Sequence, residues 1–272
     1  MKLKKYIFLI VSILLSGHIY SFDFITADGL GLGQTVILSH SSASVLLTVP
    51  SGGIDDSTVK IEMGINRKFE IKDLDQGYIA AAYRSNLFIF TLGFTQFGYR
   101  DFYAERTAKL GVAYLYDSLS VGATFSYMYV DFGRHYDRLN SGSFGLGASY
   151  HHKKVYGALM VENINSPRLD DNSEKIEPKF TAYTEVKGVG SYSITARMTV
   201  QNRESPQYGI GQKIYISSIS ALFWGLSSEP TTYGGGIELK YKKSLFTYAT
   251  SYHPVLGFSH TFSLAYMFNP YR

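Results

Sequence analysis

The chain contains no cysteine, so disulfides, thiolate metal ligands and a cysteine-linked lipid anchor are excluded. Proline occurs seven times and tryptophan once in 272 residues. The formal net charge is +4, but Lys2, Lys4 and Lys5 supply three of these charges, and the rest of the chain is almost neutral. No basic stripe or nucleic-acid-binding motif is present, so the sequence predicts no nucleic-acid partner.

The sequence also lacks a long apolar run that could form a membrane-spanning helix. Its one apolar run, residues 6–15, follows the three lysines. A helix of this length is about 15 Å long, half of the roughly 30 Å hydrocarbon thickness. Gly17 and Ser21 offer small residues for cleavage. Residues 1–21 are therefore predicted to be a secretory signal peptide, cleaved after Ser21.

Glycine, tyrosine and phenylalanine are abundant, with 26, 23 and 18 copies. The mean hydropathy is only −0.04, far below that of helical membrane proteins. Both features are typical of a membrane β-barrel, which has aromatic girdles, an apolar outer face and a lumen lined by small or polar residues. The length fits one undivided domain.

Residues 118–131 show the pattern most clearly, because apolar and small polar residues alternate as they do along a half-buried strand. One face would carry Leu119, Val121, Ala123, Phe125, Tyr127 and Tyr129. The other face would carry Ser118, Ser120, Gly122, Thr124 and Ser126. A tilted strand of about ten residues crosses a bilayer, so this segment is interpreted as one membrane-spanning strand.

About fourteen segments of this kind follow residue 58. They are residues 58–69, 77–85, 87–99, 102–116, 119–131, 141–151, 153–163, 179–187, 191–202, 207–216, 218–227, 232–242, 244–252 and 255–268. Arg197, Glu238 and Lys240 take the polar side, as expected if a lipid-facing charge costs about 2–4 kcal/mol. The sequence thus predicts an all-β fold, an antiparallel transmembrane β-barrel over residues 58–272. A soluble β-sandwich would have to bury more Tyr and Phe than two layers offer.

Residues 22–57 have a different composition. Three glycines in residues 29–33 and two small polar runs, residues 39–44 and 50–53, surround short apolar pieces. We interpret residues 22–57 as an N-terminal segment that plugs the lumen, with the glycines permitting tight packing. The alternative is one further hairpin of the barrel wall. Among the predicted connections, residues 116–119 and 151–154 are turn-sized, whereas residues 165–178 form the longest charged loop, the asymmetry of outer-membrane barrels.

A search for catalytic residues gives a negative result. Ser39, His40 and Ser41 are adjacent, as are Ser259 and His260, but neighbours on a strand face opposite sides and do not form a nucleophile–base pair. The remaining candidates are His151-His152 beside Lys153-Lys154, His253, Asp55-Asp56 and residues 73–75, all interpreted as turn or loop residues. Residues 29–33 precede no strand–helix unit and form no nucleotide loop. The sequence therefore predicts no catalytic, cofactor-binding or metal-binding residues, and no enzyme.

Five runs carry a resemblance to a known family: residues 105–122, 145–150, 162–169, 225–230 and 252–260. In this order the chain resembles outer-membrane proteins of the PorV/PorQ type, whose barrel is similar to the long-chain fatty-acid transporter (FadL). The resemblance implies about fourteen strands with an N-terminal segment inside. The chain departs from the family pattern at Val49-Pro50-Ser51-Gly52, where the family usually has Asn-Pro-Ala-Gly.

The resemblance implies two functions, and both place the chain in the outer membrane of a Gram-negative-type bacterium. One is FadL-like transport, or a channel role, for small hydrophobic molecules held in the lumen. The alternative is an accessory of type IX secretion or surface assembly that binds secreted or surface proteins. Outer-membrane lipid is the expected partner in both cases, and no cofactor is expected.

Overall fold

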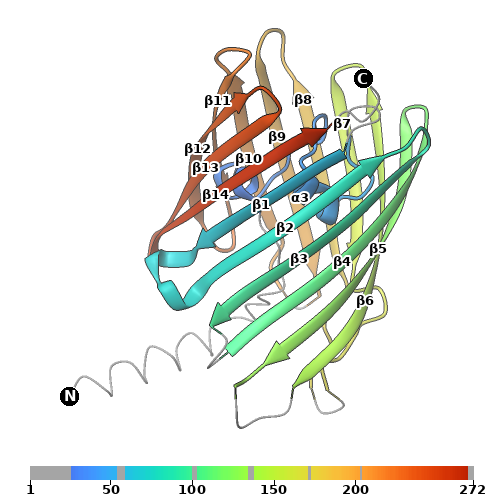
Figure 1. The fold of residues 1–272 in the computed structure, drawn as a ribbon, viewed down its shortest axis with the longest axis vertical. Coiled ribbons are helices and arrows are strands. Elements are labelled where there is room, and N and C mark those ends of the chain that lie inside the picture. Colours follow the sequence, from blue (N-terminus) through green and yellow to red (C-terminus); the bar gives the residue numbers. More distant parts are fainter. Residues whose placement is uncertain are drawn as a thin grey trace.

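The computed structural model describes residues 26–53, 59–99, 103–133, 138–170, 173–202 and 204–268. The predicted signal peptide, residues 1–21, lies outside the described residues, as does Asp55-Asp56. Within the described ranges the chain forms one closed barrel of antiparallel strands, in which each strand pairs with its sequence neighbours and β1 pairs with β14 (Figure 1). A two-layer sandwich is therefore excluded, and the predicted all-β barrel is confirmed.

Fourteen strands make up the wall within the described residues. Their bounds are β1 (Val59–Arg67), β2 (Asp75–Arg84), β3 (Phe88–Tyr99), β4 (Tyr103–Tyr116), β5 (Leu119–Asp131), β6 (Leu139–His152), β7 (Val155–Glu162), β8 (Lys179–Lys187), β9 (Tyr192–Gln201), β10 (Gln207–Tyr215), β11 (Ser220–Ser227), β12 (Thr232–Tyr241), β13 (Ser244–His253) and β14 (Gly257–Phe268). Strands β5 and β8 have the predicted bounds. Strand β1 ends before the predicted residue 69 because Phe69 and Glu70 adopt left-handed φ angles of 54° and 58°. Two short 3-10 turns, η1 (Lys68–Glu70) and η2 (Lys72–Leu74), follow there.

Side chains alternate between the two faces of the wall as the sequence predicts. On β4 and β5, Leu110 and Val121 point outward and are 52% and 47% exposed, whereas Ser120 and Thr124 point inward and are buried. The same alternation on the other strands gives the barrel an apolar outer belt. Charged residues such as Glu62, Glu185 and Lys213 take inward positions, where they avoid contact with lipid.

The two ends of the barrel differ. One end, here the turn end, carries the connections β2–β3, β4–β5, β6–β7, β8–β9, β10–β11 and β12–β13. Asp117, Lys153 and Lys242 each open a two-residue turn there with φ of 51–55°, as hairpin turns require. The other end, the loop end, carries the remaining connections, including the longest, residues 163–178. No described helix is long and apolar enough to cross a membrane.

We expect a charge on the outer belt to destabilise the folded barrel in a depth-dependent way. Leu110→Arg, in the middle of β4, should cost about 2–4 kcal/mol, because the guanidinium would face hydrocarbon. Tyr116→Arg, at the turn end of the same strand, should cost at most about 1 kcal/mol. Urea unfolding in phospholipid vesicles measures both variants, and equal costs would contradict the assignment of the belt.

Residues 26–53, here called the lumen segment, lie inside the barrel and form no part of its wall (Figure 1). The segment contains two short helices, α2 (Ala27–Gly31) and α3 (Ala43–Thr48). Thr26 and Ser42 cap their N-termini by accepting hydrogen bonds from the backbone N–H groups of Gly29 and Val45. Because β1 and β14 close the barrel directly, these residues do not form the additional wall hairpin considered as the alternative.

Candidate functional site: the lumen and its segment

Among the described carboxylates that join the wall to the lumen segment, Glu185 on β8 accepts the most hydrogen bonds. Its side chain is fully buried. One oxygen accepts hydrogen bonds from the backbone N–H groups of Leu38 and Ser39, each at 2.8 Å. The other accepts from the hydroxyls of Ser39 and Ser193, at 2.8 and 2.9 Å. Hydrogen bonds to an ionised group are strong in a low-dielectric site, so Glu185 fixes the middle of the lumen segment to the wall.

A second anchor lies on β1, across the lumen. Glu62 accepts hydrogen bonds from the backbone N–H and the hydroxyl of Ser44, at 3.1 and 2.7 Å, and from the Tyr78 hydroxyl at 2.8 Å. Lys60 donates to the carbonyl oxygen of Ser41 at 3.0 Å. These contacts hold the first turn of α3.

The end of the segment is attached to β5 and β6. The carbonyl oxygen of Ser51 accepts hydrogen bonds from the hydroxyls of Ser120 and Ser149. Near its start, the Thr35 hydroxyl is hydrogen-bonded to that of Thr195 on β9. The segment is therefore held to β1, β5, β6, β8 and β9, around much of the barrel's circumference.

Glycines on β10–β12 let the segment backbone touch the wall. A Cβ on Gly225 would lie 2.2 Å from the carbonyl carbon of Leu32, and one on Gly209 would lie 2.3 Å from the carbonyl oxygen of Gly33. Gly33 itself has φ of +66°, and a Cβ there would lie 2.2 Å from the Leu226 oxygen. No side chain fits at these separations, so the predicted role of residues 29–33 in tight packing is confirmed for Gly33.

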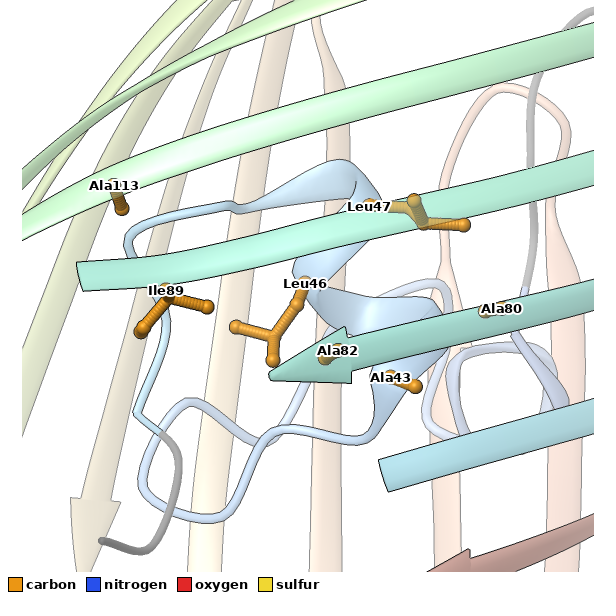
Figure 2. Close-up of a cluster of buried hydrophobic side chains, with 7 residues drawn as sticks. All are labelled: Ala43, Leu46, Leu47, Ala80, Ala82, Ile89 and Ala113. Atoms are coloured by element: carbon orange, nitrogen blue, oxygen red, sulfur yellow. The ribbon is translucent and has the colours of Figure 1, made fainter. Parts of the chain in front are cut away.

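Apolar side chains fill the remaining space between wall and segment in three clusters. In Figure 2, Leu46 and Leu47 of α3 lie against Ala80, Ala82 and Ile89 of β2 and β3. The second cluster joins Val36, Leu38, Val45 and Val49 to Ala158 and Tyr183. The third joins Leu30, Leu32 and Ile37 to Phe223 and Ala249. The wall residues in these clusters face the lumen, a position that a water-filled barrel would give to polar residues.

On the loop side of the segment there is a cavity of about 140 Å³. Its wall includes Lys109, Glu162 and Lys179, which form a charged network: Glu162 lies 2.8 Å from the Lys109 nitrogen and 3.1 Å from that of Lys179. Ile176, a buried residue of the longest loop, also lines it. Most residues around the cavity carry hydroxyl, amide or charged groups, and these stand beside apolar lining surface.

Glu162→Gln should destabilise this network. The substitution leaves two lysines without their shared carboxylate, and we expect a loss of about 2 kcal/mol, below the value for fully buried pairs because the lysine side chains remain 14% and 19% exposed. Urea unfolding of the reconstituted barrel measures the change. Glu174→Gln, on the exposed loop, is the control and should change stability little. Equal effects of the two substitutions would contradict the structural role of Glu162.

The histidines and serines considered from the sequence do not come together. Residues 39–41 form a turn rather than the assumed strand, and the Ser39 hydroxyl donates to Glu185. His260 lies on the outer face of β14, with Nδ1 2.9 Å from the Tyr248 hydroxyl. His151 stacks on Tyr156 at a hairpin end, and His253 accepts backbone N–H hydrogen bonds in the β13–β14 connection.

The candidate acidic turns show structural roles where they are described. Asp75 pairs with Arg67 through two hydrogen bonds of 2.8–2.9 Å. Within the described ranges, no three His, Asp, Glu or Cys side chains gather as metal ligands would. The sequence did not single out Glu62 or Glu185. Their only signal is a carboxylate at an inward position of its strand.

Comparison with solved structures identifies the fold. A deltaS2S3 mutant of the monoaromatic hydrocarbon channel TodX superimposes with a TM-score of 0.66, at 11% identity, over 92% of this chain and 100% of that one. A deltaS2 mutant of TodX gives 0.65, at 10% identity, over 90% and 98%. A mutant porin of Rh. blastica aligns with a TM-score of 0.47, at 8% identity, over 78% and 99%. No protein-family model and no curated protein matches the sequence.

The likeness to TodX, the closed sheet of fourteen described strands and the apolar belt define the class: a transmembrane β-barrel with the fold of outer-membrane channels. At this level of identity the comparison establishes the fold and not the transported molecule.

Proposed function

We propose that the chain is an outer-membrane channel for small hydrophobic molecules in a Gram-negative-type bacterium, with the lumen segment as its plug. The fold of a protein described as a monoaromatic hydrocarbon channel supports this proposal. The apolar outer belt supports a membrane location. The proposal includes the signal peptide, residues 1–21, and a plug unit of residues 22–57.

One observation carries the hydrophobic substrate class. Apolar residues occupy part of the inward wall that the segment covers, among them Ile89, Ala158 and Phe223. When the segment moves aside, it exposes this surface to the lumen, and an apolar solute gains free energy by contacting it. The cavity on the loop side would then be the vestibule that precedes the apolar passage.

Membership of the PorV/PorQ type is also part of this proposal. The PorV/PorQ resemblance agrees with the barrel and the internal segment, whereas no finding supports a protein partner. The accessory role in type IX secretion or surface assembly therefore stays a prediction from the resemblance. A non-enzymatic role agrees with channels as the fold neighbours.

Uptake in cells tests the proposal. The chain is expressed in a Gram-negative host that lacks its own hydrocarbon channels, and uptake of limiting radiolabelled toluene is compared with that of the same host carrying an empty vector. We expect a several-fold higher initial rate for toluene and an unchanged rate for ribose. A toluene rate equal to that of the empty-vector host, with the barrel shown to be folded by heat-modifiable migration, would overturn the proposal. So would an equal gain for toluene and ribose.

A further inference from the structure

The turn end of the barrel is strongly basic. Lys153 and Lys154 form the β6–β7 turn, and Lys242 and Lys243 form the β12–β13 turn. All four side chains are exposed. The six turn-end connections contain a single carboxylate, Asp117, and no described carboxylate pairs with any of the four lysines. Their charges are therefore uncompensated within the described part of the chain.

Apolar side chains project between the two lysine pairs. Val189 in the β8–β9 connection is 87% exposed, and Ile216 and Ile219 in the β10–β11 connection are each 62% exposed. Tyr241 is 66% exposed, and the Lys242 nitrogen lies 5.4 Å from its ring centroid. Scattered exposed apolar residues are common. Here, however, Val189, Ile216 and Ile219 lie in two consecutive turn-end connections, and Tyr241 ends β12 beside the next one.

The order of strands makes this a continuous arc. Strands β6 to β13 follow one another around the barrel, so their turns are neighbours on the turn end. The arc, here called the basic rim, thus runs from Lys153 to Lys243, with lysines at both ends and aliphatic residues between. It borders the apolar outer belt, where the hydrocarbon of a membrane gives way to the headgroup layer.

The loop end has a different charge pattern. Its described cations and carboxylates are mixed and partly paired, as in the Arg67–Asp75 pair at 2.8 Å and the Arg138–Asp131 pair at 3.9 Å. The excess of unpaired positive charge is therefore confined to one edge of the belt. Short turns of outer-membrane barrels face the periplasm, so this edge meets the inner leaflet.

We propose that the basic rim binds the phosphate groups of anionic phospholipids in the leaflet at the turn end. The lysine stems lie along the apolar edge while their ammonium groups reach the headgroup phosphates. Val189, Ile216, Ile219 and Tyr241 enter the boundary between headgroups and acyl chains, as interfacial anchors do. A lipid leaflet surrounds the whole rim, so it can contact all parts of the curved arc. A compact soluble protein would contact the arc less completely. The proposal rests on membrane insertion, and does not depend on which molecule is transported.

Lipid retention tests this inference. The barrel is reconstituted in nanodiscs of equimolar phosphatidylglycerol and phosphatidylcholine, extracted in mild detergent, and its retained lipids are quantified by mass spectrometry. The test variant carries Lys153→Gln, Lys154→Gln, Lys242→Gln and Lys243→Gln. We expect the enrichment of phosphatidylglycerol to fall at least about fivefold, the factor that one lysine contributes near an anionic surface.

A matched control carries four substitutions at exposed cations of the loop end: Lys72→Gln, Arg138→Gln, Arg168→Gln and Lys175→Gln. It should keep the enrichment of the unmodified chain. An unchanged enrichment in the test variant would overturn the proposal, as would an equal fall in the control. If the barrel retained an acidic soluble protein and showed no preference for phosphatidylglycerol, the proposal would also be overturned, and the rim would be assigned to a protein partner. Toluene uptake by the test variant is measured in parallel, so that failure of the lipid site and failure of the channel are distinguished.

Discussion

Replacing Glu185 with leucine should release the lumen segment from the wall. The substitution leaves the buried backbone N–H groups of Leu38 and Ser39 without their acceptor and removes two hydroxyl contacts. We expect the docking free energy of the segment to weaken by about 4 kcal/mol, because two buried donors and a charge-assisted network are lost. Glu185→Gln should cost only about 1 kcal/mol, because its amide group can donate to the two hydroxyls while its oxygen still accepts from the backbone.

Because the chain contains no cysteine, a single introduced cysteine can report this release without labelling elsewhere. Val49 is fully buried between segment and wall, so the thiol of a Val49→Cys background reacts with maleimide only when the segment opens. A 4 kcal/mol loss corresponds to about a thousandfold faster labelling. Glu174→Leu on the exposed loop serves as the control and should leave the rate unchanged. If Glu185→Leu labels as slowly as its parent, Glu185 does not anchor the segment.

Gly225→Val should have the second-largest effect, through steric exclusion rather than lost hydrogen bonds. The new Cβ would fall 2.2 Å from the carbonyl carbon of Leu32 and 2.5 Å from the nitrogen of Gly33. Both are backbone atoms that cannot rotate away, so the segment must shift. Overpacking of this kind costs about 2 kcal/mol or more, and we expect labelling of the introduced thiol in the Val49→Cys background to rise at least about thirtyfold.

Gly77→Val is the matched control for this prediction. Gly77 lies on β2, and a Cβ there meets no atom within 4 Å. It tests whether valine in a barrel strand by itself loosens the segment. Equal labelling rates in the two variants would show that residues 30–33 do not depend on the glycines of β10–β12 for their close contact with the wall.

The wall could be predicted almost completely from the sequence. Strands such as β5 and β8 alternate between two chemically different environments, lipid and lumen, and this period of two appears along the strands of the wall. The ends of the strands were predicted less accurately. Strand β6 begins at Leu139 rather than residue 141, and β1 stops at Arg67, because the left-handed conformations of Phe69 and Glu70 have no strong sequence signal.

The site was much less predictable. The glycines in residues 29–33 suggested tight packing, but nothing local indicated that their partners would be Gly209, Gly225 and the Leu226 backbone. Glu185 and Ser39 are 146 residues apart, and no periodic pattern relates them. A carboxylate on an inward face gives the same local sequence pattern whether it anchors a segment or is solvated in the lumen.

The sequence by itself determined that this chain is a membrane barrel with a chemically distinct N-terminal segment, because both properties depend on local alternation and composition. Only the tertiary structure decided that residues 26–53 lie inside the wall, which carboxylates hold them, and that lysines from distant turns form one rim. Closure of the barrel brings together residues far apart in the chain, and the resulting contacts depend on register and shape rather than on any local pattern.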